Sequence, residues 1–278
     1  MIRSYLFTPA HRPELVARAH ERGADAILLD LEDSVPRDHK QAARDGLADA
    51  VGALKQHGMT VAIRVNADLG ECVRDLEAAI LPGVEAIMLP KVIGADHLRL
   101  VDDYLSMLER QAKMPDGQIK LIALIETAQA LQNGADIAKA TPRLTALAFG
   151  TEDFSTDCGH APSVEALQAP AQTLVLEAKS AGLRAIGLPG SIAEIKDMDA
   201  FGDSVTLGRA IGFDAVMCIH PRQVSMVNAA FTPSATDIDH ATRVSQAFDA
   251  AVAQGLGAVM LDGKMIDPPI VARAQAML

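Results

Sequence analysis

The chain has 278 residues and a formal net charge of −11, and 49% of its residues are hydrophobic while only 3% are aromatic. This length fits one large barrel or two ordinary domains, and the composition predicts a sizeable core of Ala, Leu, Ile and Val. The acidic balance, with no basic stripe, argues against nucleic acid as the main partner. Cys72, Cys158 and Cys218 show no CxxC spacing, which argues against a disulfide framework or a zinc site. No apolar run reaches the length of a membrane span and no signal-peptide pattern is present, so we expect a cytoplasmic protein without membrane association.

Short apolar runs alternate with longer helical patterns, which is typical of parallel strands joined by helices. The predicted strands cover residues 4–7, 26–31, 61–65, 86–89, 121–125, 146–149, 184–188 and 216–219. Apolar residues at three-to-four spacing predict helices over residues 13–22, 39–56, 95–111, 128–139, 169–181 and 192–211. Eight such units predict an α/β fold, a closed (β/α)8 TIM barrel over residues 1–232, with its chemistry at the carboxyl ends of the strands.

The barrel pattern ends after residue 232. One more amphipathic helix is predicted over residues 235–254, followed by a glycine-rich turn and a final helix. We therefore expect residues 233–278 to form a C-terminal helical extension. Its sequence pattern alone indicates a cap on the surface of the barrel.

Two neighbouring predicted strands each end in a carboxylate, with Glu126 after the fifth strand and Asp153 after the sixth. Acids delivered to one face in this way suit Mg²⁺, which takes one or two carboxylates and fills its other positions with water and substrate oxygens. We therefore predict that Glu126 and Asp153 hold a metal. The alternative is that these acids, or Thr127 and Thr151, cap the helices that follow.

Other strand ends add charged side chains to the same predicted rim. The carboxyl end of the second strand contributes Asp30, Glu32 and Asp33, and that of the third contributes Arg64. A planar guanidinium at a strand end is suited to gripping a carboxylate with two parallel hydrogen bonds. A structural ion pair between Arg64 and one of the three acids is the alternative, and the two roles are compatible.

The strand-end segments together resemble the successive motifs of the citrate lyase beta-subunit-like family, which includes malyl-CoA and citramalyl-CoA lyases. They are residues 3–9, 29–35, 64–66, 89–92, 124–127, 149–154, 219–223 and 262–267, so the resemblance spans nearly the whole chain. It implies a homotrimer or hexamer that uses Mg²⁺, or Mn²⁺ as a substitute, to cleave or form a carbon–carbon bond in a CoA thioester of a β-hydroxy acid. It also makes citrate lyase alpha and acyl-carrier subunits possible partners.

The resemblance also implies roles for single residues. Glu126 and Asp153 match the metal ligands, and Arg64 matches the clamp on the substrate carboxylate. Asp267 would reach from a neighbouring subunit, whose extension covers this active site, to act as acid or base. The acids that would orient metal-bound water and Arg64 are Asp30, Glu32 and Asp33. The positions near the thioester arm are Phe7, Arg18, Ile219 and His220, although for His220 we favour the alternative of a structural histidine that caps the helix after the eighth strand.

The chain departs from the family pattern after the seventh strand. Gly187 and Pro189 stand where many members carry an acid, and residues 157–162 lack the arginines common there. These differences leave the substrate open. Besides a thioester lyase, the residues allow a metal-dependent aldolase acting on free 2-oxo acids, or a degenerate member that binds acyl thioesters without turnover.

Overall fold

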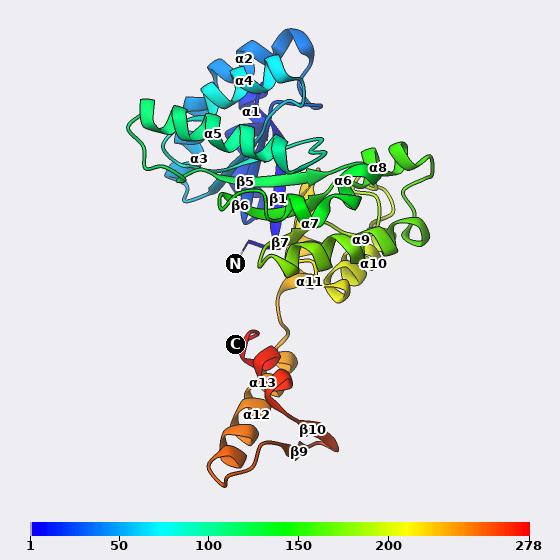
Figure 1. Ribbon diagram of the computed structural model, residues 1–278. Coiled ribbons are helices and arrows are strands. Elements are labelled where there is room, and N and C mark those ends of the chain that lie inside the picture. The colour runs from blue at the N-terminus through cyan, green and yellow to red at the C-terminus, as the bar shows by residue number, and fades with distance from the viewer. Residues whose placement is uncertain (1) are drawn as a thin grey trace. The chain divides into compact units, whose positions relative to one another are not determined.

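A computed structural model describes residues 2–278 of the chain. The chain divides into two compact units, one ending at Phe231 and the other spanning Thr232–Leu278. Figure 1 traces the elements of both units. Each unit has its own hydrophobic core.

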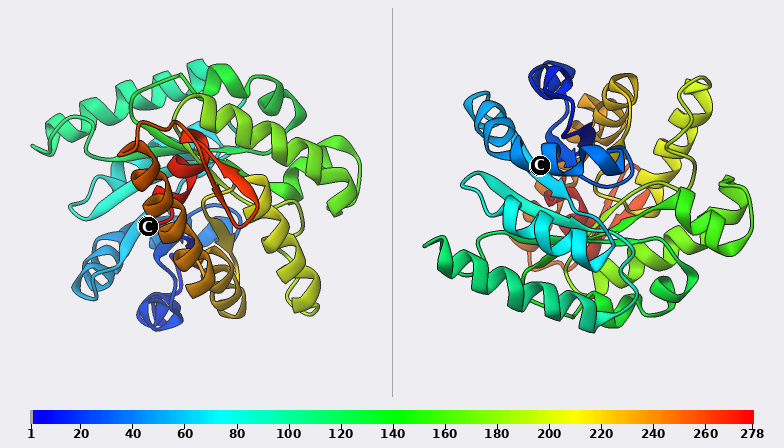
Figure 2. Two further views of the ribbon diagram at one scale, coloured as in Figure 1. Left: turned by 90° about the horizontal axis from the view of Figure 1, so that it is seen from below. Right: turned by 90° about the horizontal axis from the view of Figure 1, so that it is seen from above.

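The first unit is built on a sheet of eight strands, which pair in parallel in the order β7-β6-β5-β4-β3-β2-β1-β8. They are β1 (Ser4–Pro9), β2 (Ala26–Asp30), β3 (Thr60–Arg64), β4 (Val84–Leu89), β5 (Lys120–Ile125), β6 (Leu144–Phe149), β7 (Arg184–Ile186) and β8 (Val216–Cys218). The two edges meet at a seam, where an isolated parallel bridge joins Ile186 to Ala215. The sheet is thus a nearly closed barrel surrounded by helices, which confirms the predicted fold (Figure 2).

The helices lie outside this sheet. They are α1 (Pro13–Val16), α2 (Lys40–Asp45), α3 (Leu47–Gln56), α4 (Leu69–Ala79), α5 (Ala95–Gln111), α6 (Ala128–Gln132), α7 (Gly134–Ile137), α8 (Thr151–Cys158), α9 (Val164–Ser180), α10 (Met198–Ile211) and α11 (Pro221–Phe231), with 3-10 turns at Ala19–Arg22 and Arg37–His39.

Several predicted helices differ from those observed. The helix predicted over residues 39–56 is interrupted at Gly46, and the one over residues 128–139 is interrupted at Asn133. The ninth helix begins five residues earlier than the predicted residue 169, because Ser163 accepts a hydrogen bond from Ala166 N and caps it; Pro170 then lies inside the helix. The helices α4 and α8 were not predicted, and no range was predicted for α11, the helix after the eighth strand.

Two apolar clusters hold the barrel together because its strands are buried on both faces. Inside the barrel, side chains such as Tyr5, Leu28 and Met217 pack with several alanines. Outside it, strand residues such as Ile63 and Phe149 pack against the helices. The small interior residues agree with a core that is poor in aromatic side chains.

The second unit contains α12 (Ala235–Val252), a hairpin of β9 (Val259–Leu261) and β10 (Lys264–Ile266), and α13 (Pro268–Gln275). The hairpin replaces part of the predicted helical extension. Its two-residue turn, Asp262 and Gly263, has φ values of 50° and 76°, as the type I′ hairpin turn requires. Each strand has only three residues, too few to give a recognisable alternation in the sequence.

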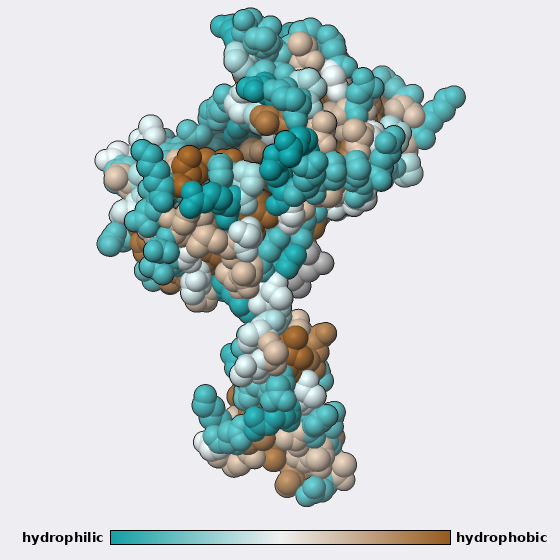
Figure 3. All heavy atoms as spheres, turned by 180° about the vertical axis from the view of Figure 1, so that it is seen from behind, coloured by the Kyte–Doolittle hydropathy of each residue, from teal (hydrophilic) through white to brown (hydrophobic). Residues whose placement is uncertain are grey.

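Hydrophilic side chains cover most of the face shown in Figure 3, and apolar side chains on it are scattered in small groups. Within residues 2–278, no helix combines the length and the apolar character that crossing a bilayer requires.

Candidate active site

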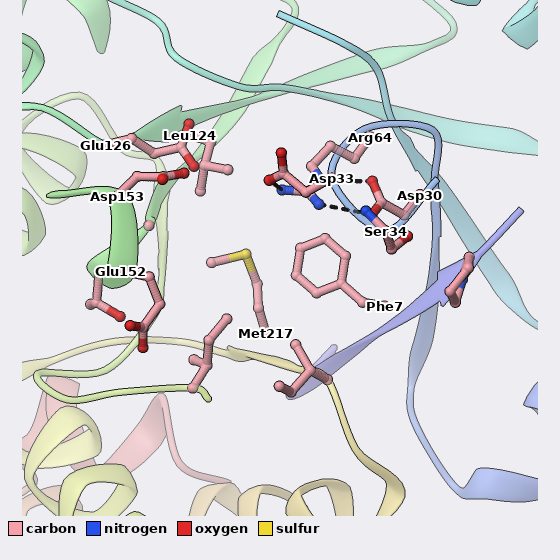
Figure 4. A pocket seen from close by; sticks show the side chains of 15 residues that line it. Phe7, Asp30, Asp33, Ser34, Arg64, Leu124, Glu126, Glu152, Asp153 and Met217 are labelled. Carbon is pink, nitrogen blue, oxygen red and sulfur yellow. Dashed lines mark hydrogen bonds and ion pairs between the residues drawn. The ribbon is translucent and has the colours of Figure 1, made fainter. Parts of the chain in front are cut away.

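The carboxyl ends of the barrel strands surround a cavity with a volume of about 410 Å³. Glu126 and Asp153 lie on one wall, and Arg64 lies on another with Asp30 and Asp33 (Figure 4). Apolar side chains complete the lining; they include Phe7, Leu124, Ile192, Met217 and Ile219. The structure therefore brings four of the five predicted strand-end acids and the arginine to one cavity, whereas Glu32 does not line it.

Glu126 follows β5 and is almost completely buried, with a relative exposure of 3%. Lys91 N donates a hydrogen bond of 2.7 Å to its Oε2, from a backbone in the left-handed region with φ of 49°. Burial raises the pKa of Glu126 to about 8, and the charges of Glu32 and Asp153 also raise it, whereas the Lys91 hydrogen bond lowers it.

Gly150 makes room for Glu126. A Cβ at this position would lie 2.4 Å from Glu126 Cγ, far inside van der Waals contact. The residue between β6 and α8 must therefore be glycine if Glu126 is to keep this conformation.

Asp153 lies in the first turn of α8, which begins directly after the strand β6 and Gly150. The capping alternative holds for neither acid. Thr127 caps α6 by accepting a hydrogen bond from Ala130 N at 3.1 Å, and α8 has no side-chain cap. Glu126 and Asp153 are thus available to the cavity.

The residues present fit a divalent cation. A buried carboxyl group with a raised pKa lies close enough to a second acid for the two charges to repel, and a cation between them would remove that repulsion. Residues 2–278 hold no cluster of three or more His, Cys, Asp or Glu side chains arranged for a metal. A pair of carboxylates is the kind of site that Mg²⁺ uses together with water and substrate oxygens.

Arg64 forms the structural ion pair that the sequence allowed as an alternative. Its Nε and Nη2 donate to the two oxygens of Asp30 at 2.7 and 2.8 Å. Its Nη1 lies 2.9 Å from Glu32 Oε2 and 3.3 Å from Asp33 Oδ2. The Phe7 ring centroid is 4.7 Å from the guanidinium carbon, a cation–π contact. Asp30 occupies one edge of the guanidinium, so a substrate carboxylate would have to bind the other edge, formed by Nη1 and Nη2.

The acids after β2 differ in charge state. Burial tends to raise the pKa of Asp30, but the hydrogen bonds and the charge of Arg64 outweigh it, so that the pKa of Asp30 is lowered. Burial raises the pKa of Glu32 to about 7, although Arg64 and Lys91 oppose the shift. Asp30 is therefore the permanent anion that pairs with Arg64.

The loop that carries these acids, residues 31–34, is held by side chains that the sequence did not single out. Lys40 Nζ donates to the carbonyl oxygens of Leu31 and Glu32 at 2.8 and 2.9 Å. Asn66 Nδ2 donates to Leu31 O at 2.8 Å. Asn66 is itself held by the fully buried Asp75, which accepts from its backbone and side chain at 2.8 and 2.6 Å.

Three of the predicted site residues lie elsewhere or have another role. Arg18 is exposed, pairs with Glu21 at 3.0 Å and does not line the cavity. His220 Nδ1 accepts a hydrogen bond of 3.1 Å from Arg222 N, which confirms the capping alternative. Asp267 belongs to the second unit and caps α13, where it accepts a bond of 3.4 Å from Ile270 N.

The structure also explains the glycine after the seventh strand. Gly187 has φ of 150°, and a Cβ there would lie 3.0 Å from both Phe149 Cβ and Phe213 Cε1. The missing acid is therefore replaced by close packing of the backbone against two phenylalanine side chains. The loops after β7 and β8 are joined by the fully buried Gln223, which accepts from Ile219 N at 2.9 Å and donates to Ile192 O at 2.8 Å.

A nearly closed parallel barrel, with paired carboxylates and a guanidinium in a cavity at the carboxyl ends of its strands, defines a (β/α)8 enzyme with a candidate divalent-metal site.

The sequence profile of the HpcH/HpaI aldolase/citrate lyase family matches residues 3–221. The chain therefore belongs to this family, which confirms the resemblance and the prediction that it is an enzyme of the lyase class. It is 30% identical to citrate lyase subunit beta of Leuconostoc mesenteroides subsp. cremoris, over 99% of this chain and 92% of the relative. It is 34% identical to a (3S)-malyl-CoA thioesterase of Cereibacter sphaeroides, over 99% of this chain and 93% of the relative.

Solved structures agree with this membership. A crystal structure of CitE from Mycobacterium tuberculosis in complex with magnesium, acetoacetate and coenzyme A superimposes with a TM-score of 0.77 and 30% identity. The match covers 99% of this chain and 96% of that one, so it extends beyond the barrel into the second unit.

Proposed function

We propose that the protein is a Mg²⁺-dependent lyase that cleaves a β-hydroxyacyl thioester, such as a malyl, citramalyl or citryl thioester, into an acetyl thioester and a 2-oxo acid. The observation that carries the proposal is the pair Glu126 and Asp153 in one cavity with Arg64. The CitE relative with magnesium, acetoacetate and coenzyme A supports the same ligand chemistry.

The reaction breaks the bond between the hydroxyl-bearing carbon and the carbon next to the thioester carbonyl. The hydroxyl loses its proton and becomes the carbonyl of the 2-oxo acid, while the electron pair of the broken bond forms the thioester enolate, which is then protonated. Held by Glu126 and Asp153, Mg²⁺ would supply Lewis acidity for the oxygen of the forming 2-oxo acid.

The remaining groups of the chain orient the substrate. The Nη1–Nη2 edge of the Arg64 guanidinium, whose Nη1 also contacts Glu32 and Asp33, binds the carboxylate beside the reacting carbon. Asp30 binds the other edge of that guanidinium and Glu32 contacts its Nη1, so the two acids restrict its rotation. Phe7 and Ile219 provide apolar surface for the thioester arm.

Asp267 is the proposed acid or base, and it would come from the second unit of a neighbouring subunit in a homotrimer or hexamer. Asp267 stands at the N-terminus of α13 and is only partly buried, so its carboxylate can contact a ligand as well as cap the helix. Citrate lyase alpha and acyl-carrier subunits are proposed as partners if the substrate is a citryl thioester.

A screen of thioesters tests the function. The purified protein is incubated with malyl-, citramalyl- and citryl-thioesters and Mg²⁺, and both the 2-oxo acid and free CoA are measured. We expect 2-oxo acid release with at least one substrate, stopped by EDTA and restored by Mg²⁺ or Mn²⁺. Release of CoA without 2-oxo acid would instead assign the thioester hydrolysis named for the Cereibacter sphaeroides relative. Turnover of free 2-oxo acids without any thioester would assign the aldolase alternative, and binding of a thioester without turnover would assign the degenerate one.

A further inference from the structure

Two of the three acids on the helix α8, Asp153 and Asp157, contact different parts of the molecule. Asp153 lies in its first turn and lines the cavity, whereas Asp157 lies one turn later and does not. Residues four apart lie on the same face of a helix, one above the other. The face of α8 that presents Asp153 therefore also presents Asp157.

Asp157 binds the segment that carries the other candidate metal ligand. Its Oδ2 accepts a hydrogen bond of 2.8 Å from Ala128 N. Ala128 is the first residue of α6 and follows Glu126 by two positions. The Thr127 side chain accepts from Ala130 N, so Asp157 satisfies a different one of the N–H groups that open α6.

A second hydrogen bond ties the same two segments on the other side of the acids. Gly150 N, just before α8, donates to Ile125 O at 3.0 Å. The two bonds thus flank Glu126, between Ile125 and Ala128, and they flank Asp153, between Gly150 and Asp157. The first bond follows from the backbone of neighbouring strands, but the second depends on one side chain.

We propose that Asp157 is a positioning residue, which fixes the spacing between Glu126 and Asp153 and thereby sets the affinity of the site for a divalent cation. This inference rests on the proposed function, because it takes these two acids as the metal ligands. Without the bond to Ala128, the start of α6 and the second turn of α8 are free to move apart, and the two carboxylates lose their common orientation. Side chains that orient metal ligands are typically worth 10- to 100-fold in metal affinity, roughly the range expected here.

The test measures cation binding directly, by calorimetry with Mg²⁺ and by the electron paramagnetic resonance signal of free Mn²⁺. We expect Asp157→Ala to weaken binding about tenfold. Asp157→Asn should stay within about threefold of wild type, because the amide oxygen accepts the same bond. Asp103→Ala, which removes an equal charge from an exposed site on α5, is the matched control and should leave binding unchanged.

A second variant removes the bond from its other end. Ala128→Pro lacks the donor N–H, and proline is well tolerated at the first position of a helix. It should weaken binding as Asp157→Ala does, with folding of each variant checked by circular dichroism. Wild-type affinity in both Asp157→Ala and Ala128→Pro, or equal loss in Asp157→Ala and Asp157→Asn, would overturn the role of Asp157. Absence of binding in the wild-type protein would instead overturn the metal site and with it the proposed function.

Discussion

Replacement of Asp153 tests the proposed metal site with least damage to the fold. It is half-buried in the first turn of α8, and the isosteric change Asp153→Asn removes the charge while leaving the side-chain volume unchanged. We expect Mg²⁺-dependent release of 2-oxo acid to fall at least about a hundredfold, because one of the two proposed anionic ligands is lost. Thermal unfolding should stay within a few degrees of wild type. If turnover persists at the wild-type rate, Asp153 is not part of the site.

Lys40 supports the site by binding backbone carbonyl oxygens of the loop over residues 31–34. Its ammonium donates to the carbonyls of Leu31 and Glu32 and so holds the loop over residues 31–34, whose Glu32 contacts Arg64. We expect Lys40→Met to lower kcat roughly tenfold, because Glu32 is no longer fixed against the guanidinium. The matched control is Lys55→Met, which removes a more exposed lysine that pairs with Glu85 at 3.3 Å. Steady-state kinetics that are indistinguishable between the two variants would exclude this role for Lys40.

Among residues predicted from the sequence, those at strand ends were placed correctly, because each of them follows an apolar run whose end is readable. Arg64, Glu126 and Asp153 line the cavity for this reason. Lys40, Asn66 and Asp157 were missed as positioning groups because their partners are backbone atoms brought near only by the fold. Arg18 was placed by resemblance alone, and the 3-10 turn that follows it directs its side chain to Glu21 instead.

At the scale of elements, the packing of α9 against α7 buries an acid outside the active site. Glu177 on α9 lies so close to α7 that a Cβ on Gly134 would fall 1.7 Å from its Oε2, and this oxygen has no hydrogen-bond partner among the described residues. Burial raises the pKa of Glu177 from 4.5 to about 7. The folded state therefore binds the proton more tightly than the unfolded state, and stability is lost as the pH rises from about 4.5 through 7.

The neutral variant should escape that loss. We expect Glu177→Gln to raise the free energy of unfolding by roughly 1–2 kcal/mol at pH 8, a figure reduced for partial exposure, and to have little effect at pH 4. Thermal unfolding of both proteins between these pH values measures the difference. Glu165→Gln is the control on the same helix, since the pKa of Glu165 is lowered by a backbone hydrogen bond and by Ser163, and it should bring no gain at pH 8. A pH-independent difference between wild type and Glu177→Gln would contradict the argument.

Strands and helices could be predicted from the sequence where the pattern of buried apolar residues alone determines them. All eight strands were predicted because each is an apolar run of the right length, and α5 matches its predicted bounds because its apolar stripe is regular. The breaks at Gly46 and Asn133 were missed because neither residue interrupts the three-to-four pattern of apolar positions. The hairpin of the second unit was missed although Asp262 and Gly263 are a hairpin turn signal, since the strands beside them are short.

For the whole molecule, the proposal that Asp267 acts on a neighbouring subunit predicts that two inactive variants complement each other. Asp153→Asn disables the barrel site, and Asp267→Asn disables the acid or base while asparagine keeps the cap of α13. Subunits of the two variants are mixed, allowed to exchange and assayed. We expect recovery of about a quarter of the wild-type rate, the chance that an intact barrel meets an intact second unit in a closed ring.

Gel filtration accompanies that experiment. A trimer or hexamer that recovers activity on mixing supports a site shared between subunits. A monomer, or an oligomer that stays inactive after subunit exchange, would place Asp267 outside the catalytic site and leave α13 with a capping aspartate only.

The seam between β7 and β8 determines where the barrel opens locally. Strands β2 and β3 pair along five residues, whereas β7 and β8 are held by one bridge and by the bonds from Gly187 N to Ala215 O and from Asp214 N to Ala185 O. Local opening costs least where the fewest bonds must break, so transient widening is concentrated at this gap. Ile192 and Ile219 follow the strands on its two sides and are linked across it by Gln223, so we expect the mouth to widen only as far as this side chain allows. Arg64 pairs with Asp30 and Glu32 at the ends of the fully paired strands β2 and β3. We therefore expect these ion pairs to persist when the seam opens.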